Sequence, residues 1–196
     1  TSKLLGTVAG AGLALCGMAS AQETAGPKNI ILMVGDGMGF AQMEAASLYT
    51  YGELQGQPYW DHQVLACTTY AASGRGSDPE QAAADFSYVL KDATDSAAGA
   101  TTLSSGVKTL NKAIGVDVNE QPLRHLYEDA EAMGKATGVL SSVYLSHATP
   151  AGFTTHHSSR NDVDVLAEDM IRNSTLDVLM APGHPWFDDD GKPIGG

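Results

Sequence analysis

The stretch Asn29-Ile30-Ile31-Leu32-Met33-Val34, followed at once by Gly35-Asp36-Gly37-Met38-Gly39, decides the predicted fold. Residues 30–34 are continuously apolar, which is typical of a central strand covered on both faces, as in a parallel sheet. Residues 38–48 then have a helical composition. A strand, a glycine turn and a helix are therefore predicted in that order.

The rest of the chain continues this alternation. Further strands are predicted at residues 64–70, 136–145 and 177–180, and residues 75–84 are predicted as a loop. Helices are predicted to start at Thr94 or Asp95 and to cover residues 122–135 and 163–171, with Pro122 in the first turn of the second. Strands that alternate with helices predict the α/β class, with a mostly parallel central sheet and helices on both faces.

Composition limits the function. The 196 residues carry a formal net charge of −12 and are 43% hydrophobic, which fits one domain with a core. The acidic balance argues against a nucleic-acid partner and against an anionic membrane surface, because both need a basic face. A site for an anionic substrate would therefore need local positive charge from metal ions, arginine or helix N-termini.

Residues 1–21 are predicted to be a signal peptide. Lys3 precedes an uncharged run, Leu4 to Met18, and Ala19-Ser20-Ala21 offers small residues at a cleavage site. The mature chain would be residues 22–196, without a membrane span and located in the periplasm or secreted. Cys67 is then the only cysteine of the mature chain, so no internal disulfide can form, and we predict a small buried hydrophobe there.

Three motifs contain residues suited to chemistry. Asp36 lies between glycines at the carboxyl end of the first predicted strand, where ligands gather in open α/β sheets. An ordinary turn aspartate is the alternative. A dinucleotide fingerprint is a further alternative, and Phe40 argues against it because it stands where the third glycine of that motif belongs.

Asp95-Ser96-Ala97 is the second motif. A serine at a helix start lies near free backbone N–H groups that favour anions. Its hydroxyl becomes a nucleophile only when a base or a metal activates it. An ordinary capping serine is the alternative, and the lack of a G-x-S-x-G elbow argues against an acyl hydrolase.

The third motif runs from Ser146 to Arg160. His147 and Thr149 are two residues apart at the end of a predicted strand, so we expect their side chains on one side of an extended segment, both able to serve a metal. Arg160 offers a planar fork that matches two phosphate oxygens. The alternative is a set of ordinary surface or core histidines.

Together the three motifs resemble alkaline phosphatase in residues, order and approximate spacing. The matching stretches are Gly35–Gly39, Thr94–Ala98 with Gly106–Thr109, Gly115–Asp117, His147–Ala151, His156 and Arg160. The resemblance covers about residues 28–180. It implies an alkaline-phosphatase-like fold that is incomplete in this chain, with residues 22–196 as the N-terminal part of the catalytic domain.

The resemblance also implies roles. Asp36 would ligate a zinc ion beside a magnesium site, Ser96 would be the nucleophile that forms a phosphoserine at the metal, and Arg160 would hold the phosphate. Asp95 would orient Arg160, and Thr149 and His147 would belong to the magnesium site, where His147 stands in place of the aspartate of some family members. His156 has a motif match without an assigned role. The implied cofactors are two Zn²⁺ ions and Mg²⁺, and the implied substrates are small phosphate monoesters.

The family's remaining zinc ligands lie downstream of these motifs and have no match here, because residues 183–191 are predicted to be a solvated acidic loop. Homodimers are common in the family, so a homodimer is a further expectation. Two alternatives stay open: a non-catalytic periplasmic phosphate- or metal-binding protein, and a phosphodiesterase of the same superfamily. A sulfatase is not favoured, because the residues from Ser96 onward do not match C/S-x-P-x-R.

Overall fold

The computed structural model describes residues 28–54, 67–76, 78–183 and 192–194. The chain divides into two compact units, residues 1–34 and residues 35–196. The predicted signal peptide lies outside the described residues, and so do residues 184–191 of the predicted acidic loop. Within the described part of the chain, no helix is both long enough and apolar enough to cross a bilayer.

The first predicted strand is wrong. Residues 29–34 are assigned no strand, and their large side chains are exposed, with Ile31 at 81% and Met33 at 87%. An extended segment becomes a strand only when a neighbouring strand satisfies its backbone groups. Neither strand of the described residues pairs with this run, so its apolar character alone does not bury it.

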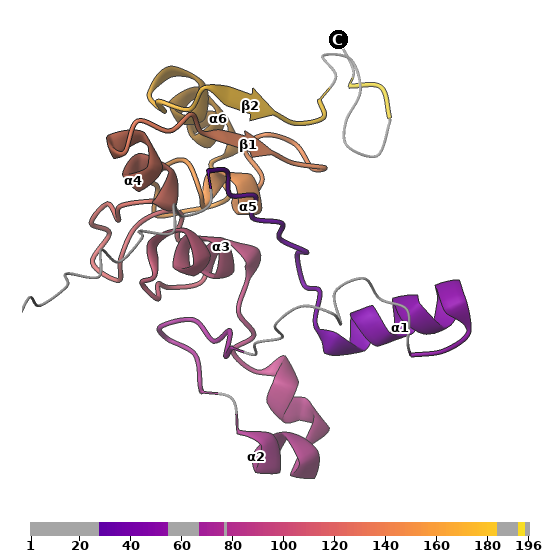
Figure 1. Ribbon diagram of the computed structural model, residues 1–196. Helices are drawn as coiled ribbons and strands as arrows, with labels where there is room; N and C mark the ends of the chain where they lie inside the picture. Colours follow the sequence, from indigo (N-terminus) through magenta and orange to yellow (C-terminus); the bar gives the residue numbers. More distant parts are fainter. Residues whose placement is uncertain (1–27, 55–66, 77, 184–191, 195–196) are drawn as a thin grey trace, which may run out of the picture. The chain divides into compact units, whose positions relative to one another are not determined.

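The second unit contains the helices and strands labelled in Figure 1 and the short 3-10 helix η1, which has no label there. In chain order the elements are α1 (Phe40–Tyr51), α2 (Pro79–Ala84), η1 (Phe86–Leu90), α3 (Ser96–Ser105), α4 (Leu126–Ala132), β1 (Gly138–Leu140), α5 (Ala148–Ala151), α6 (Val163–Arg172) and β2 (Val178–Met180). Helices α1, α3 and α6 and strand β2 lie where the sequence predicts them, within a few residues.

The described sheet consists of β1 and β2, which run parallel with Val139 opposite Leu179. The connection between them passes through α5 and α6, as parallel pairing requires. The α/β class and the parallel pairing are therefore confirmed. Strand β1 is shorter than the predicted 136–145, because its partner β2 offers only three residues of ladder.

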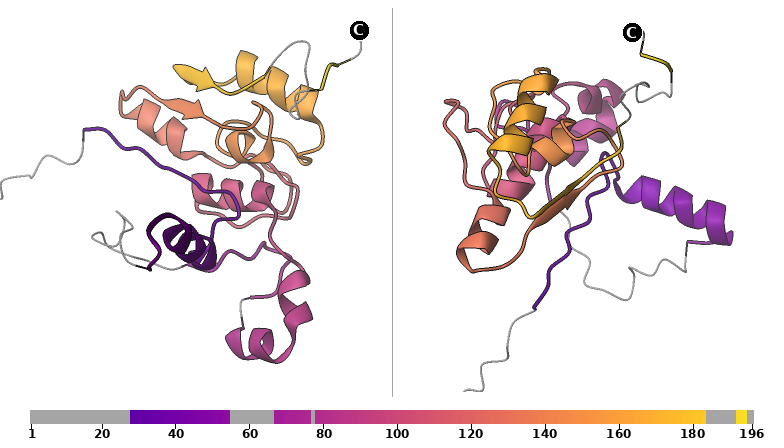
Figure 2. Two further views of the ribbon diagram at one scale, coloured as in Figure 1. Left: turned by 90° about the vertical axis from the view of Figure 1, so that its right-hand side faces the viewer. Right: turned by 90° about the horizontal axis from the view of Figure 1, so that it is seen from above.

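The core forms where α3, α5 and α6 meet. Three of its buried residues are alanines. The cluster consists of Ala97, Ile114, Ala148, Ala151, Leu166 and Met170. Helix α3 approaches α5 closely, since a Cβ added to Gly152 would lie 2.7 Å from Cβ of Ala100. Both views of Figure 2 place these two helices next to each other. This packing holds the first turn of α3 firmly.

Two predictions around α2 are corrected. The predicted loop 75–84 contains α2, because the carboxylate of Asp78 accepts the backbone N–H groups of Glu80 and Gln81 and Pro79 starts the helix. The predicted strand 64–70 is not formed over residues 67–70, and residues 64–66 lie outside the described residues. Cys67 is exposed, not buried, because without a strand it has no sheet face to pack on.

Helix α4 is shorter than predicted. It begins after His125 and not at Pro122, which instead forms an isolated antiparallel bridge with Val116. The side chain of Glu128 accepts the backbone N–H of His125 at 2.7 Å, which fixes the helix start at this point. The predicted amphipathic stripe thus extended beyond the hydrogen-bonded helix.

Candidate functional site

Ser96 is the first residue of α3, and Asp95 is its N-cap. An oxygen of Asp95 accepts the backbone N–H of Ala98 at 2.9 Å, which stabilises the first turn. The first N–H groups of a helix lack intrahelical partners and attract anions. Because Ala97 and Ala98 are fully buried, the backbone that carries Ser96 is fixed by packing. The predicted helix start and its cap are confirmed.

Asp36 links distant parts of the chain. Its carboxylate oxygens accept a hydrogen bond from Ser96 Oγ at 3.0 and 2.9 Å, and one of them accepts a second from Thr149 Oγ1 at 3.0 Å. Asp36 lies in a tight turn in which Gly37 has a φ of 65°, a conformation that favours glycine. Three of the residues selected from the sequence therefore meet at one carboxylate.

The prediction for His147 and Thr149 is partly wrong. They do not lie on an extended segment, because His147 is the N-cap of the short helix α5 and Thr149 lies inside that helix. The ring of His147 packs edge-on against Tyr144, with ring centroids 5.2 Å apart. Its Nδ1 atom is buried and has no hydrogen-bond partner. Thr149 joins Asp36, whereas no hydrogen bond joins His147 to Asp36, Ser96 or Thr149.

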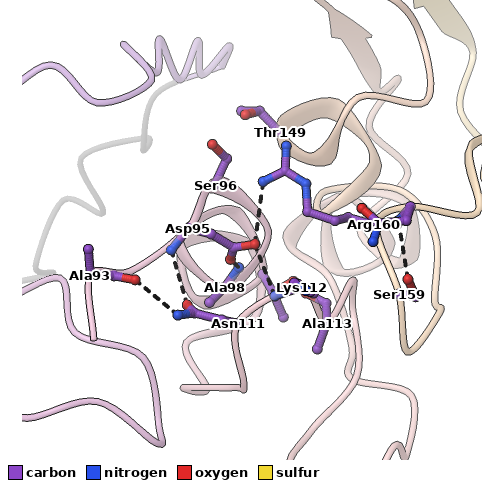
Figure 3. A network of polar contacts seen from close by, with 12 residues as sticks. Ala93, Asp95, Ser96, Ala98, Asn111, Lys112, Ala113, Thr149, Ser159 and Arg160 are labelled. Atoms are coloured by element: carbon purple, nitrogen blue, oxygen red, sulfur yellow. Dashed lines mark hydrogen bonds and ion pairs between the residues drawn. The ribbon is translucent and has the colours of Figure 1, made fainter. Parts of the chain in front are cut away.

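Arg160 and Asp95 form a half-buried pair, shown in Figure 3. The guanidinium Nη1 lies 3.4 Å from Asp95 Oδ2, and each side chain is 23% exposed. The same Asp95 oxygen accepts the backbone N–H of Lys112 at 3.0 Å, and the carbonyl of Lys112 accepts the backbone N–H of Arg160 at 2.8 Å. This geometry supports the expected role of Asp95, which is to orient Arg160.

Asn111 and Lys112 also belong to this network, although neither was predicted from the sequence. The side-chain oxygen of Asn111 accepts the backbone N–H of Asp95 at 3.0 Å, and its amide group donates to the carbonyl of Ala93 at 2.9 Å (Figure 3). Lys112 has a φ of 73°, an uncommon conformation for a residue with a side chain. No local pattern marks these two residues, because their hydrogen-bond partners lie 16 or more residues away along the chain.

His156 lies outside this cluster. Its Nε2 is 2.7 Å from the carbonyl oxygen of Leu123, and its ring packs against that of His125 at 4.6 Å. The loop Gly115–Asp117 is likewise structural. The pKa of Asp117 lies below its ordinary value, because its carboxylate accepts the backbone N–H groups of Gln121 and Asn119.

The oxygen atoms around Asp36 fit a hard divalent cation in part. One carboxylate and two hydroxyls converge, and carboxylate and hydroxyl oxygens are the ligands that Mg²⁺ prefers. The buried, unpartnered Nδ1 of His147 is a further donor nearby in sequence. Among the described residues, no group of three or more His, Cys, Asp or Glu side chains converges. These residues can therefore supply only part of a metal coordination shell.

Several known proteins that this chain resembles are alkaline phosphatases. The family model described as "Alkaline phosphatase" matches residues 27–193. Alkaline phosphatase 4 of Bacillus subtilis (strain 168) is 35% identical over 190 residues, which cover 93% of this chain and 39% of that protein. Alkaline phosphatase of Escherichia coli (strain K12) is 41% identical over 137 residues, or 68% of this chain and 26% of that protein.

Solved structures agree with these relatives. The cold-active alkaline phosphatase from a psychrophilic Shewanella sp. matches with a TM-score of 0.63 at 35% identity, covering 81% of this chain and 37% of that one. A histidine-to-glutamate mutant of the alkaline phosphatase from the Antarctic bacterium TAB5, with Mg bound in its M3 site, also gives 0.63 at 30% identity, covering 85% and 43%. The chain thus spans less than half the length of these relatives.

Proposed function

The chain belongs to the alkaline phosphatase family, and from that premise we propose that it carries the nucleophile and the phosphate-binding arginine of a metal-dependent phosphomonoesterase. Small phosphate monoesters are the proposed substrates. The observation that carries the proposal is the contact of Ser96 Oγ with both oxygens of Asp36, at the N-terminus of α3. We also propose export to the periplasm or the exterior, which rests on residues 1–21.

Ser96 is the proposed nucleophile. Its hydroxyl hydrogen points to Asp36, so a lone pair of Oγ is left to face a phosphorus atom. The N-terminus of α3 adds a favourable field for the phosphate. Attack by Oγ forms the bond to phosphorus as the bond from phosphorus to the ester oxygen breaks. The Ser96 hydroxyl proton ends on the departing oxygen by way of solvent, so that an alcohol is released and a phosphoserine remains. Water then cleaves that phosphoserine and releases inorganic phosphate.

Arg160 is the proposed phosphate clamp. The guanidinium has five N–H donors, and its contact with Asp95 is through Nη1. The remaining donors can meet two phosphate oxygens in the planar arrangement that arginine provides. Asp95 and the carbonyl of Lys112 hold the side chain and the backbone of Arg160, so its orientation is set before substrate arrives.

Metal ions complete the proposed site. Asp36, Ser96, Thr149 and His147 are the residues of this chain that would hold them, with Zn²⁺ and Mg²⁺ as the proposed ions. Such ions lower the pKa of a bound hydroxyl and stabilise charge on transferring phosphoryl oxygens. Further ligands must complete the coordination, since the donors around Asp36 are too few for a closed site.

The test is a comparison of Ser96→Ala with Ser105→Ala. Both serines lie in α3, but Ser105 donates to the carbonyl of Thr101 in the last turn and is remote from Asp36. With Zn²⁺ and Mg²⁺ supplied, we expect Ser96→Ala to lower p-nitrophenyl phosphate hydrolysis by at least about 10³-fold. Ser105→Ala should keep most of the activity.

The assay uses this chain as it stands and, where its gene encodes more residues, the full product. Mass spectrometry of the quenched enzyme should find one phosphoryl group on the peptide that contains Ser96. Phosphate binding without turnover in the full product would favour a non-catalytic binding protein. Faster hydrolysis of bis-p-nitrophenyl phosphate than of the monoester would favour a phosphodiesterase.

A further inference from the structure

Asn111 is a half-buried residue to which the proposed reaction gives no role. Its side-chain oxygen accepts the backbone N–H of Asp95 at 3.0 Å, and its amide group donates to the carbonyl oxygen of Ala93 at 2.9 Å (Figure 3). One amide thus holds the backbone on both sides of Thr94. Because the two hydrogen bonds leave from the two ends of a rigid group, they fix both the position and the direction of that backbone.

The backbone that Asn111 holds carries a carboxylate with two separate tasks. Oδ1 of Asp95 accepts the N–H of Ala98 at 2.9 Å and so caps α3, and Oδ2 lies 3.4 Å from Nη1 of Arg160. Since both oxygens belong to one rigid carboxylate, a rotation that improves one contact disturbs the other. The position of the Asp95 backbone therefore decides whether the helix cap and the arginine contact can exist together.

The residue after Asn111 contributes through its backbone. The N–H of Lys112 donates to Oδ2 of Asp95 at 3.0 Å, and the carbonyl oxygen of Lys112 accepts the N–H of Arg160 at 2.8 Å. The φ of Lys112 is 73°, which is costly for a residue with a side chain and persists only where the surroundings impose it. The two long-range hydrogen bonds of its N–H and carbonyl groups meet that requirement.

The segment that carries Asn111 is itself anchored in the core. Ile114, which is 0% exposed, exchanges two backbone hydrogen bonds of 2.8 Å with His157. The side chains of Asp95 and Arg160 are each 23% exposed, so water competes for their contacts. Asn111 therefore reaches from a backbone fixed by buried contacts to a charged pair that burial alone does not fix.

We propose that Asn111 is a positioning residue, which holds the backbone of Asp95 so that one carboxylate can both cap α3 and orient Arg160 toward phosphate. The inference rests on the proposed function for the contact of Arg160 with phosphate. The hold of Asn111 on the Asp95 carboxylate, in contrast, is a property of the fold and can be measured without phosphate.

The first experiment is a double-mutant cycle on phosphate affinity, with Zn²⁺ and Mg²⁺ supplied. Asn111→Ala removes both hydrogen bonds of the amide, so the Kd for inorganic phosphate should rise about threefold to tenfold. In the Arg160→Ala background the same substitution has no arginine left to misplace, and the Kd should change less than about twofold. Equal factors in the two backgrounds would overturn the proposal, because Asn111 would then act on the site without Arg160.

Asn173→Ala is the matched control. The amide group of Asn173 donates to a carboxylate oxygen of Asp169 at 2.7 Å, at the C-cap of α6. Its loss removes an asparagine hydrogen bond elsewhere and should leave the phosphate Kd within about twofold of the wild-type value. A rise equal to that of Asn111→Ala would show that affinity follows general stability, and the proposal would fall. Asn111→Leu, which is close to asparagine in volume, replaces Asn111→Ala if that variant does not fold, with the same factors expected.

The second experiment needs no phosphate. Amide hydrogen exchange, followed by NMR, reports the N–H groups of Ala98 and Lys112, which both donate to Asp95, with the N–H of Ile114 as the internal reference. In Asn111→Ala, both should exchange severalfold faster relative to Ile114 than in the wild type, because the carboxylate that accepts them is no longer held. Unchanged ratios would overturn the proposal.

The two experiments separate this inference from the proposed function. Both use this chain as it stands and, where its gene encodes more residues, the full product. If the wild type binds no phosphate, the proposed function fails for this chain, and the exchange ratios alone decide whether Asn111 positions Asp95. If phosphate binds and the factors of the cycle are equal, the proposed function stands and the role of Asn111 falls.

Discussion

The apolar run at residues 29–34 and the small-residue helix α3 behave in opposite ways. The run contains Ile31 and Met33, which are 81% and 87% exposed, whereas Ala97 and Ala98 of α3 are fully buried. Hydrophobicity alone would predict deeper burial for Ile31 and Met33 than for Ala97 and Ala98. Helix α3 is buried because α5 and the residues around Ile114 cover it. Burial depends on a partner surface at the right distance, and small side chains let that surface come close.

The two regions also differ in what they contribute to the proposed site. The proposed site lies next to this buried helix, where the half-buried Asp95 and Arg160 and the exposed Lys112 are joined by hydrogen bonds and an ion pair. Its geometry therefore depends on contacts that the chain supplies by itself. Within the described residues, the exposed run contributes nothing to those contacts, although its apolar sequence predicted a central strand.

The largest expected effect is on stability. Ile114→Ala removes a side chain with 0% exposure and should lower the free energy of unfolding by about 2–5 kcal/mol. Ile31→Ala is the matched control and should change it by less than about 0.5 kcal/mol, because Ile31 is already exposed. Urea unfolding measures both. Equal losses would show that the run is buried in solution and would break the comparison.

Arg160→Lys tests the functional side. Lysine keeps the charge but loses the planar fork, so phosphate should bind about 10- to 100-fold more weakly, at nearly unchanged stability. Arg172→Lys is the control, since Arg172 is paired with Glu168 on the exposed surface of α6. Phosphate inhibition of p-nitrophenyl phosphate hydrolysis gives both values. Equal affinities in the two variants would remove Arg160 from the phosphate site.

The smallest expected effects are changes in stability caused by a methyl group added next to α3 or within it. Gly152→Ala places a Cβ against Ala100 and should cost about 1–3 kcal/mol of stability. Gly99→Ala, inside α3, meets nothing within 4 Å and should instead stabilise by about 0.5–1 kcal/mol. The urea midpoint measures the two opposite shifts. A loss in both variants would mean that α3 tolerates no added methyl group on either side.

Several local features could be predicted from the sequence. The start of α3 at an Asp95 cap, the helix at residues 163–171 and the strand at 177–180 are confirmed, because caps and side-chain periodicity act within a few residues. The loop at residues 75–84 was predicted wrongly, although Asp78 followed by Pro79 is a helix-start pattern. A local pattern therefore does mark the start of α2.

The prediction for His147 and Thr149 failed for a different reason. An extended segment would have placed both side chains on one side, but the chain turns into α5 at His147. Residues two apart share one side of an extended segment but not of a helix. Of the two, only Thr149 therefore hydrogen-bonds to Asp36. The metal roles, including that of His147, stay predictions, as do the phosphoserine, the homodimer and the signal peptide.

The sequence by itself determined which chemical groups the chain holds, in which order, and where α3 and α6 begin, since these depend on neighbours a few residues apart. The three family motifs could be recognised in the sequence for the same reason, since each spans only a few residues. Only the tertiary structure decided which groups meet. Asp36 contacts Ser96 and Thr149 across 60 and 113 residues. Contacts over such separations exist only after α3, α5 and the Arg160 segment have packed, and no local pattern encodes the distance between them.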